Sequence, residues 1–134
     1  MFVDAAAIVA MLSQEAEAPR CSQAIMEAPA PFTSAIAVWE ASMALSRSEK
    51  LAVPVEVSLR IVSRFLEERA IALRELPPAS EATSLSIEAA SRFRNNAIRL
   101  NLADCFHYAC ARYYAVSILS TADEFRLTDL ETVP

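Results

Sequence analysis

Short β-type segments alternate with longer amphipathic segments along this chain, and the alternation constrains the fold more than any other feature. The β-type segments are brief and bounded by proline or polar residues, which is typical of buried strands. We expect strands at residues 2–3, 32–33, 71–76 and 116–120. We expect helices at residues 5–12, 15–27, 34–48, 54–68, 80–93 and 101–114, and an irregular return at 121–130. Strands that alternate with helices predict an α/β sandwich with a mainly parallel sheet, formed by residues 1–134 as one domain.

The charge of the chain limits the partners that it can bind. A net charge of −5 excludes a protein that grips nucleic acid by general electrostatic attraction, so any RNA or DNA contact has to be local. Basic residues usually lie on solvated helix faces, but a few basic residues of this chain are candidates for such a local contact. These candidates are Arg47, Lys50, Arg92, Arg94, Arg99, Arg112 and Arg126.

Two features bear on the cellular compartment. The longest aliphatic run, residues 5–12, is far shorter than the roughly 20 residues that span a bilayer, and the first basic residue is Arg20, so neither a membrane span nor a secretory signal is expected. The three cysteines, Cys21, Cys105 and Cys110, have no CxxC spacing, which indicates reduced thiols. We therefore expect a cytoplasmic protein that does not bind membranes.

Four acidic residues stand alone in, or just after, apolar stretches. They are Asp4, Glu40, Asp104 and Asp123. An unpaired carboxylate in an apolar setting costs several kcal/mol or takes up a proton, so such acids are usually paired or bind a metal ion. Each has an ordinary alternative, because Asp104 can complement a helix N-terminus, Asp123 can belong to a turn and Glu40 can pair with an arginine.

The expected topology gathers these acids at one edge of the sheet. Asp4 and Asp123 follow expected strands, and ligands of open parallel sheets bind outside the carboxyl ends of the strands. Glu40 and Asp104 lie on helices whose side chains can reach the same edge. Oxygen ligands of this kind suit Mg²⁺ or Mn²⁺, which can activate water and stabilise phosphoryl charge. Ser34 and Thr121 are candidate hydroxyl supports, and Glu124 can share or replace the role of Asp123.

Four stretches together resemble the PIN-domain ribonucleases, specifically the VapC-like toxins of bacterial toxin–antitoxin pairs. The stretches are MFVDAAAIVA, VWEASMAL, LNLADCFHYACA and ILSTADEFRLTDLE, and they span essentially the whole chain. The resemblance implies a PIN-like three-layer α/β/α sandwich with four to five strands in the sheet. It also implies a metal-dependent endoribonuclease with Asp4, Glu40, Asp104 and Asp123 as its acidic cluster. A homodimer and an antitoxin that blocks the site are implied as partners.

Two positions depart from the family pattern. Ala6 stands where the family usually has Ser, Thr or Asn, and Ala103 stands where it has glycine before the third acid. Neither change removes a ligand, but changes around a metal commonly cost about 10–100-fold in affinity or activity. The alternative function is therefore a weak or inactive PIN-like module that binds an antitoxin or another helix. Its candidate surface residues, which can equally belong to the hydrophobic core, are Ile8, Leu12, Ile25, Met26, Trp39 and Met43.

The complete absence of glycine is the other unusual property of this sequence. Alanine occupies positions where a turn would normally have glycine, namely Ala70, Ala97 and Ala115. We hypothesise that the chain is a Gly→Ala version of a natural parent, with strain wherever φ has to be positive. Without glycine there is no phosphate-binding loop and no dinucleotide-binding fingerprint.

A cysteine nucleophile is not expected beside the third acid. Cys105 and His107 are two residues apart on an expected helix, so their side chains point to different faces. Buried core cysteines are the better interpretation. A zinc site would need more Cys and His than any one segment supplies.

Overall fold

A five-stranded sheet with every strand parallel forms the centre of the computed structural model, which describes residues 1–95 and 98–134. The strand order is β3-β2-β1-β4-β5. The strands are β1 Phe2–Val3, β2 Phe32–Ser34, β3 Ala72–Arg74, β4 Ile118–Leu119 and β5 Thr132–Val133. Phe2 pairs with Phe32 on one side and with Ile118 on the other, so β1 lies at the middle of the sheet.

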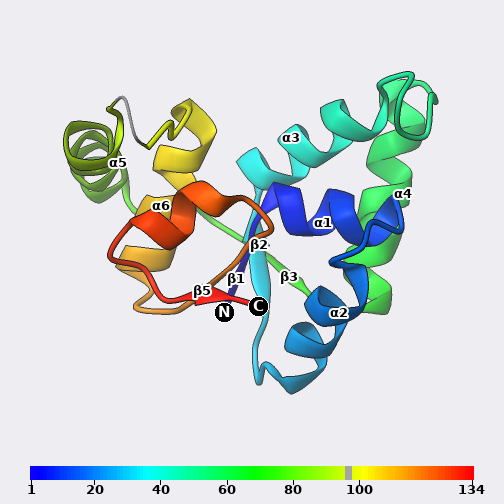
Figure 1. Ribbon diagram of the computed structural model, residues 1–134, viewed down its shortest axis with the longest axis horizontal. Coiled ribbons are helices and arrows are strands. Elements are labelled where there is room, and N and C mark those ends of the chain that lie inside the picture. The colour runs from blue at the N-terminus through cyan, green and yellow to red at the C-terminus, as the bar shows by residue number, and fades with distance from the viewer. Residues whose placement is uncertain (96–97) are drawn as a thin grey trace.

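Helices cover both faces of this sheet (Figure 1). Figure 1 shows α1 to α4 on one face and α5 and α6 on the other. The helices are α1 Ala5–Leu12, α2 Ala18–Glu27, α3 Ala35–Leu45, α4 Val55–Glu68, α5 Ala79–Phe93 and α6 Leu102–Tyr113, with the 3₁₀ helix η1 at Asp123–Leu127. The expected three-layer α/β/α sandwich with a parallel sheet is therefore confirmed.

The central strands supply the hydrophobic core. Phe2, Val3, Ile118 and Leu119 are completely buried, because helices cover both faces of β1 and β4. Tyr108 of α6 is also completely buried and packs against this core from the second face. The two central strands are consequently held rigidly, and so are the residues that follow them.

The expected elements agree with the structure except near the ends of segments and beyond residue 120. Helix α2 begins at Ala18 where residue 15 was expected, and the expected strand at 116–120 is reduced to Ile118–Leu119. The expected irregular return at 121–130 contains η1, and β5 beyond it was not predicted. Two paired residues are too few to leave a periodic pattern in the sequence. Among the described residues, no helix combines the length and apolarity required to cross a bilayer.

Alanine takes the place of glycine at two helix ends. Ala70 follows α4 and Ala115 follows α6, both with φ of 51°, which is the left-handed region that favours glycine. The positive φ expected at these alanines is confirmed at the two positions, and Ala52 has φ of 53° as well. The descent from a glycine-containing parent stays a hypothesis. Ala97, the third alanine of the hypothesis, lies outside the described residues.

Candidate functional site

The carboxyl ends of β1 and β4 bring Asp4 and Ser120 together. These two residues directly follow adjacent parallel strands, and the backbone N–H of Asp4 donates to the carbonyl of Leu119 at 3.0 Å. Asp4 is the N-cap residue of α1, so its carboxylate lies beside the first N–H groups of that helix. The strand end and the helix cap together place a carboxylate that is only 2% exposed.

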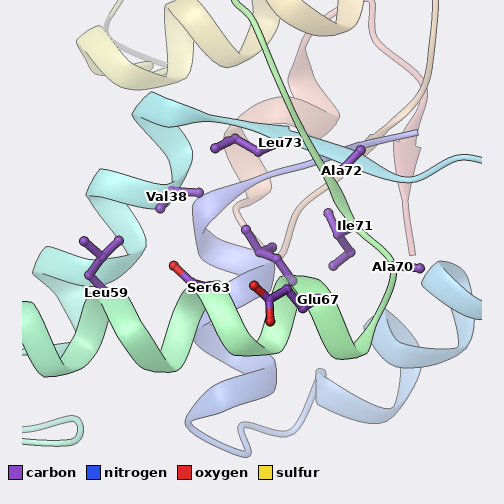
Figure 2. Close-up of a pocket in the computed structure, with 9 residues that line it drawn as sticks. Val38, Leu59, Ser63, Glu67, Ala70, Ile71, Ala72 and Leu73 are labelled. Carbon is purple, nitrogen blue, oxygen red and sulfur yellow. The ribbon is translucent and has the colours of Figure 1, made fainter.

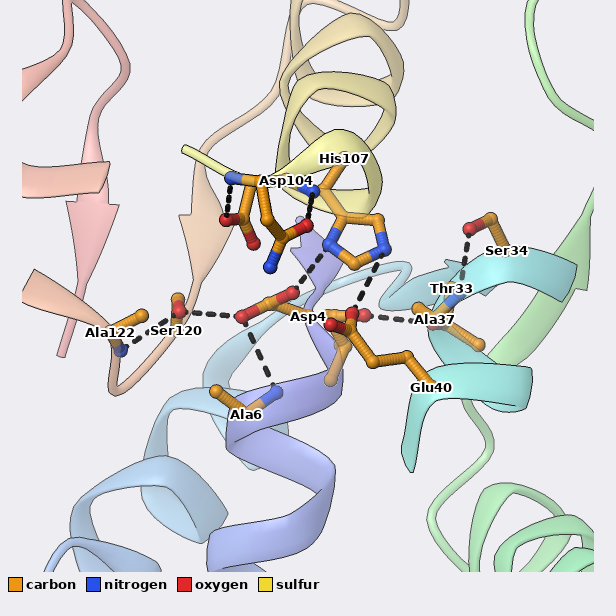
Figure 3. Close-up of polar contacts among 12 residues, drawn as sticks. Asp4, Ala6, Thr33, Ser34, Ala37, Glu40, Asp104, His107, Ser120 and Ala122 are labelled. Atoms are coloured by element: carbon orange, nitrogen blue, oxygen red, sulfur yellow. Dashed lines mark hydrogen bonds and ion pairs between the residues drawn. The ribbon is translucent and has the colours of Figure 1, made fainter. Parts of the chain in front are cut away.

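Both oxygens of the Asp4 carboxylate have partners (Figure 3). Oδ2 accepts hydrogen bonds from the Ser120 hydroxyl at 2.6 Å and from the backbone N–H of Ala6 at 3.3 Å. Oδ1 lies 2.7 Å from Nδ1 of His107, a residue of α6. Ser120 Oγ also accepts from the N–H of Ala122 at 3.1 Å, which fixes its hydroxyl toward Asp4. Asp4 is therefore held in one orientation.

Glu40 and Asp104 face the same pocket from opposite layers. Glu40 lies in the second turn of α3, and its Oε2 is 3.8 Å from His107 Nε2. Asp104 lies in the first turn of α6, where it forms a reciprocal capping box with Asn101. The pocket has a volume of about 510 Å³. Its lining includes Asp4, Glu40, Asp104, Glu124, Trp39, Arg47 and Arg99.

The carboxylates and His107 shift one another's ionisation. Burial by itself opposes the charged forms of Asp4 and His107, but their mutual contact prevails, so the pKa of Asp4 is lowered and that of His107 is raised. Burial raises the pKa of Glu40 and of Asp104, and the negative charge of Asp4 adds to both shifts. The pocket thus contains the buried ion pair of Asp4 and His107. The carboxyl groups of Glu40 and Asp104 lie near the negative charge of Asp4, which disfavours their own ionisation.

Three of the described side chains lie close enough together that they could hold one metal ion. Asp4, Glu40 and His107 each offer one ligand atom, and these atoms lie within 4.8 Å of one another. In the same part of the chain, His107 is the one basic side chain in ion-pair contact with Asp4 or Glu40. The excess of carboxylates in a partly buried pocket fits a divalent cation.

The structure brings three of the four expected acids together and places the fourth elsewhere. The side chain of Asp123 is 94% exposed and lines a separate hollow, with Arg126 at 3.8 Å. Its neighbour Glu124 lines the pocket with Asp4. The two residues diverge because they belong to η1, in which consecutive side chains point in different directions.

The expected hydroxyl supports have other roles in the structure. Ser34 caps α3 by accepting the N–H of Ala37 at 3.3 Å, and Thr121 lines the hollow that contains Asp123. Ser120 is the hydroxyl that contacts Asp4. Ala6 lines the acidic pocket, where its side chain offers only a methyl group, whereas Ala103 is half-buried in α6.

Sequence reasoning missed the contact between His107 and Asp4. Its signal was present, because residues three apart on a helix share a face and His107 follows Asp104 by three. Ser120 could also have been found, since it ends the strand that lies beside β1. The pairing order of strands that are distant in sequence was needed for both inferences.

An apolar groove lies apart from the acids, between α3, α4 and β3 (Figure 2). Its volume is about 560 Å³, and Figure 2 labels Val38, Leu59, Ile71 and Leu73 along it. Leu59 and Leu73 are about half exposed. The groove is a hydrophobic surface that a protein partner can cover.

The residues expected on a partner-binding surface divide into two sets. Ile8 and Ile25 are buried in the core, which is the alternative that the sequence left open for this set. Met26 and Trp39 are mostly exposed, at 76% and 64%. The difference follows from helix geometry, because α1 and α2 turn one face to the sheet and its neighbouring helices.

Comparison with known proteins gives three findings. A PIN domain family model matches residues 1–129. A VapC ribonuclease of Mycobacterium bovis and ribonuclease VapC42 of Mycobacterium tuberculosis are each 30% identical over 132 residues, which cover 97% of this chain and 96% of the relative. The solved structure of Mycobacterium tuberculosis VapC20, described as a sarcin-ricin loop cleaving toxin, has a TM-score of 0.73 at 14% identity and covers 99% of this chain and 98% of that one.

Proposed function

Because the chain belongs to the PIN-domain family, we propose that it is a VapC-type endoribonuclease and the toxin of a toxin–antitoxin pair. Its active site is the pocket lined by Asp4, Glu40 and Asp104. The observation that carries this proposal is their convergence: three acids from distant segments of the chain line one pocket. A PIN fold alone would not require this pocket to keep its carboxylates, since fold does not determine function.

The pocket suits Mg²⁺ or Mn²⁺ as cofactor. Both ions prefer carboxylate oxygen and keep open positions for water and phosphate, and the pocket offers carboxylates with raised pKa values that gain from a nearby cation. When bound, such an ion lowers the pKa of a water molecule and stabilises phosphoryl charge. Hydrolysis requires attack by water on the RNA phosphorus with loss of a proton from that water, and departure of the 3′-oxygen, which takes up a proton.

The protein residues have separate tasks in this reaction. Asp4 is held rigidly by Ser120 and by the N-terminus of α1, so it sets the position of the negative charge in the pocket. Glu40 has a side chain that is 31% exposed, which lets it adjust as ligand or base. Glu124 takes the place expected for Asp123, because it lines the pocket.

Basic and aromatic residues at the pocket suit an RNA substrate. Arg47 and Arg99 line the same pocket as the acids and place local positive charge there, as an acidic protein requires for binding phosphate. Trp39 also lines the pocket and is 64% exposed, so its ring can stack on an unpaired base. Single-stranded or looped RNA is therefore the substrate class that we propose. The sarcin-ricin loop, the target named for VapC20, is one RNA to include in a screen.

The proposed partners are an antitoxin and a second copy of the chain. The resemblance to VapC toxins implies both, and the apolar groove along Leu59 and Leu73 provides an exposed hydrophobic surface. A toxin that acts on cellular RNA belongs in the cytoplasm, which is the compartment that we propose.

The alternative function is a catalytically weak module that binds a partner. Ala6 favours it, because this residue lines the pocket without the hydroxyl or amide that the family usually has there. The Asp4–His107 pair favours it as well, since Asp4 is already neutralised without a metal ion. Metal-dependent cleavage separates the two functions, because a module that only binds partners needs neither a metal nor turnover.

The experiment is a cleavage assay on labelled single-stranded and stem-loop RNAs with Mg²⁺, with Mn²⁺ and with EDTA. We expect cleavage that requires the metal and is abolished by Glu40→Gln. Glu40 is preferred to Asp4 for this purpose because it is not fully buried and does not cap a helix. Glu67→Gln is the matched control, since Glu67 lines the apolar groove away from the pocket.

The same assay distinguishes the two adjacent acids. Glu124→Gln is expected to lower activity strongly, whereas Asp123→Asn is expected to leave it near that of the unsubstituted protein. Loss of activity in Asp123→Asn alone would assign the role to Asp123. Cleavage that persists in EDTA, or in Glu40→Gln, would refute the proposed function.

A further inference from the structure

His107 is completely buried and lies against Asp4 and Glu40, two of the residues that line the acidic pocket. One face of its ring packs near Phe2, with ring centroids 5.6 Å apart. Figure 3 shows its two ring nitrogens directed at two carboxylates, Nδ1 at Asp4 and Nε2 at Glu40. The imidazole is therefore fixed in a position from which it can act on both acids.

The two ring nitrogens differ in their contacts. Nδ1 is in ion-pair contact with Asp4 at 2.7 Å, whereas Nε2 is 3.8 Å from the Glu40 carboxylate; among residues 1–95 and 98–134 neither nitrogen has a hydrogen-bond partner of good geometry, and Nε2 lacks a close ion-pair contact as well. A buried nitrogen without a partner is unfavourable, and in native proteins it calls for a water molecule, an ion or a functional role. Because Nε2 faces a carboxylate of the pocket, an ion between them would satisfy both groups.

We propose that Nε2 of His107 is a direct ligand of the divalent cation, together with Asp4 and Glu40. This proposal rests on the proposed function of the pocket. One ligand atom from each of the three residues lies within 4.8 Å of the others, which is a span that one ion can bridge after small side-chain movements. The site would thus be a mixed nitrogen and oxygen site, in place of an acid-only one.

Asp4 can orient the imidazole and still bind the ion. An ionised carboxylate has about four lone-pair sites, and three contacts with Asp4 are seen, from His107, Ser120 and the Ala6 N–H. The charged ion pair belongs to the metal-free protein, and His107 gives up its Nε2 proton when the ion binds. The Asp4 carboxylate then holds Nδ1–H and leaves the lone pair of the histidine on Nε2, which is the arrangement found around many metal-binding histidines. Asp4 is then both ligand and orienting residue.

The nature of the ligands predicts the choice of ion. Imidazole nitrogen suits transition metals, whereas Mg²⁺ prefers oxygen and gives up its water reluctantly. We expect the protein to bind Mn²⁺ or Co²⁺ more tightly than Mg²⁺, and removal of His107 to reduce that preference. If His107 were instead a fixed positive charge that takes the place of the metal, its removal would strengthen the binding of every divalent cation.

The test is pulsed electron paramagnetic resonance of Mn²⁺ bound to the unsubstituted protein. Since the chain contains a single histidine, an imidazole nitrogen modulation on bound Mn²⁺ can arise only from His107. We expect that modulation in the unsubstituted protein and not in His107→Gln, whose Mn²⁺ affinity falls by about 10-fold or more while its Mg²⁺ affinity changes less. Circular dichroism checks that the variant is folded.

The outcomes separate this inference from the proposed function. Bound Mn²⁺ without imidazole modulation would overturn the role of His107 as ligand and leave the acidic metal site intact. Equal or tighter Mn²⁺ binding by a folded His107→Gln variant would overturn it as well. Failure of the unsubstituted protein to bind Mn²⁺ at all would refute the proposed function, and this inference with it.

Discussion

Replacing Ala70 and Ala115 by glycine is expected to stabilise the protein. Both alanines follow the last turn of a helix with φ of 51°, and each belongs to a Schellman motif. At α4, the N–H groups of Ala70 and Ile71 donate to the carbonyls of Glu67 and Leu66. The end of α6 repeats this pair of hydrogen bonds. The motif therefore forces a left-handed conformation on a residue that has a Cβ atom.

The expected gain follows from two opposing terms. An L-residue in the left-handed region costs roughly 1–2 kcal/mol, whereas glycine loses about 0.5–1 kcal/mol more backbone entropy on folding. The net gain is about 0.5–1 kcal/mol for each Ala→Gly substitution. With an unfolding entropy of about 2.1 cal/mol/K for each of 134 residues, one substitution raises Tm by about 2–4 °C. The double variant is expected to rise by about 4–7 °C, since the two helix ends are independent.

The assay is differential scanning calorimetry, supported by urea denaturation. Ala24→Gly in the interior of α2 is the matched control, and it is expected to lower stability by about 0.5–1 kcal/mol because its φ is helical. Ala70 and Ala115 are both exposed, so their substitution opens no cavity. If glycine lowers stability at these positions as it does at Ala24, the assignment of strain is wrong.

Three further outcomes concern charge, hydrogen bonding and metal. In metal-free protein the Asp4–His107 pair makes its full contribution to the free energy of unfolding between pH 3.8 and 6.5. Below this window the contribution is lost as the pH falls through the lowered pKa of Asp4, and above it the contribution is lost as the pH rises through the raised pKa of His107. The Tm difference between the unsubstituted protein and His107→Ala should therefore narrow outside this window, and a difference independent of pH would contradict the ion pair. Tyr108→Phe should lower the free energy of unfolding by about 1 kcal/mol in urea, because the Tyr108 hydroxyl donates to Asp129 at 2.9 Å, and an unchanged midpoint would contradict this. Mn²⁺ at about 100 times its Kd should stabilise by about 2.7 kcal/mol, or roughly 10 °C in scanning fluorimetry, and no shift would argue against a specific site.

Local sequence rules predicted most of the order of helices and strands along the chain. Prolines flank the short segment before Phe32 and mark the end of a helix there. The capping residues Ser34 and Asn101 mark where two further helices begin. The isolated carboxylates pointed to one sheet edge because parallel strands share a carboxyl end. The convergence of Asp4 and Glu40 could therefore be predicted without coordinates.

The remaining parts of the site depend on geometry that local patterns do not contain. The contact between His107 and Asp4 joins α6 to β1 across 103 positions of sequence, and it depends on the packing of α6 against the sheet. Whether Asp123 or Glu124 enters the pocket depends on the direction of one 3₁₀ turn. Adjacent acids in such a turn cannot be told apart by composition.

The most direct test of the account is calorimetric titration of Mn²⁺ into the unsubstituted protein, Glu40→Gln and the control Glu67→Gln. We predict saturable binding that Glu40→Gln weakens by about 10-fold or more and that Glu67→Gln leaves unchanged, because Glu40 lines the acidic pocket whereas Glu67 lines the apolar groove. Absence of Mn²⁺ binding by the folded protein, or equal binding by all three proteins, would contradict a metal-dependent nuclease site at Asp4 and Glu40.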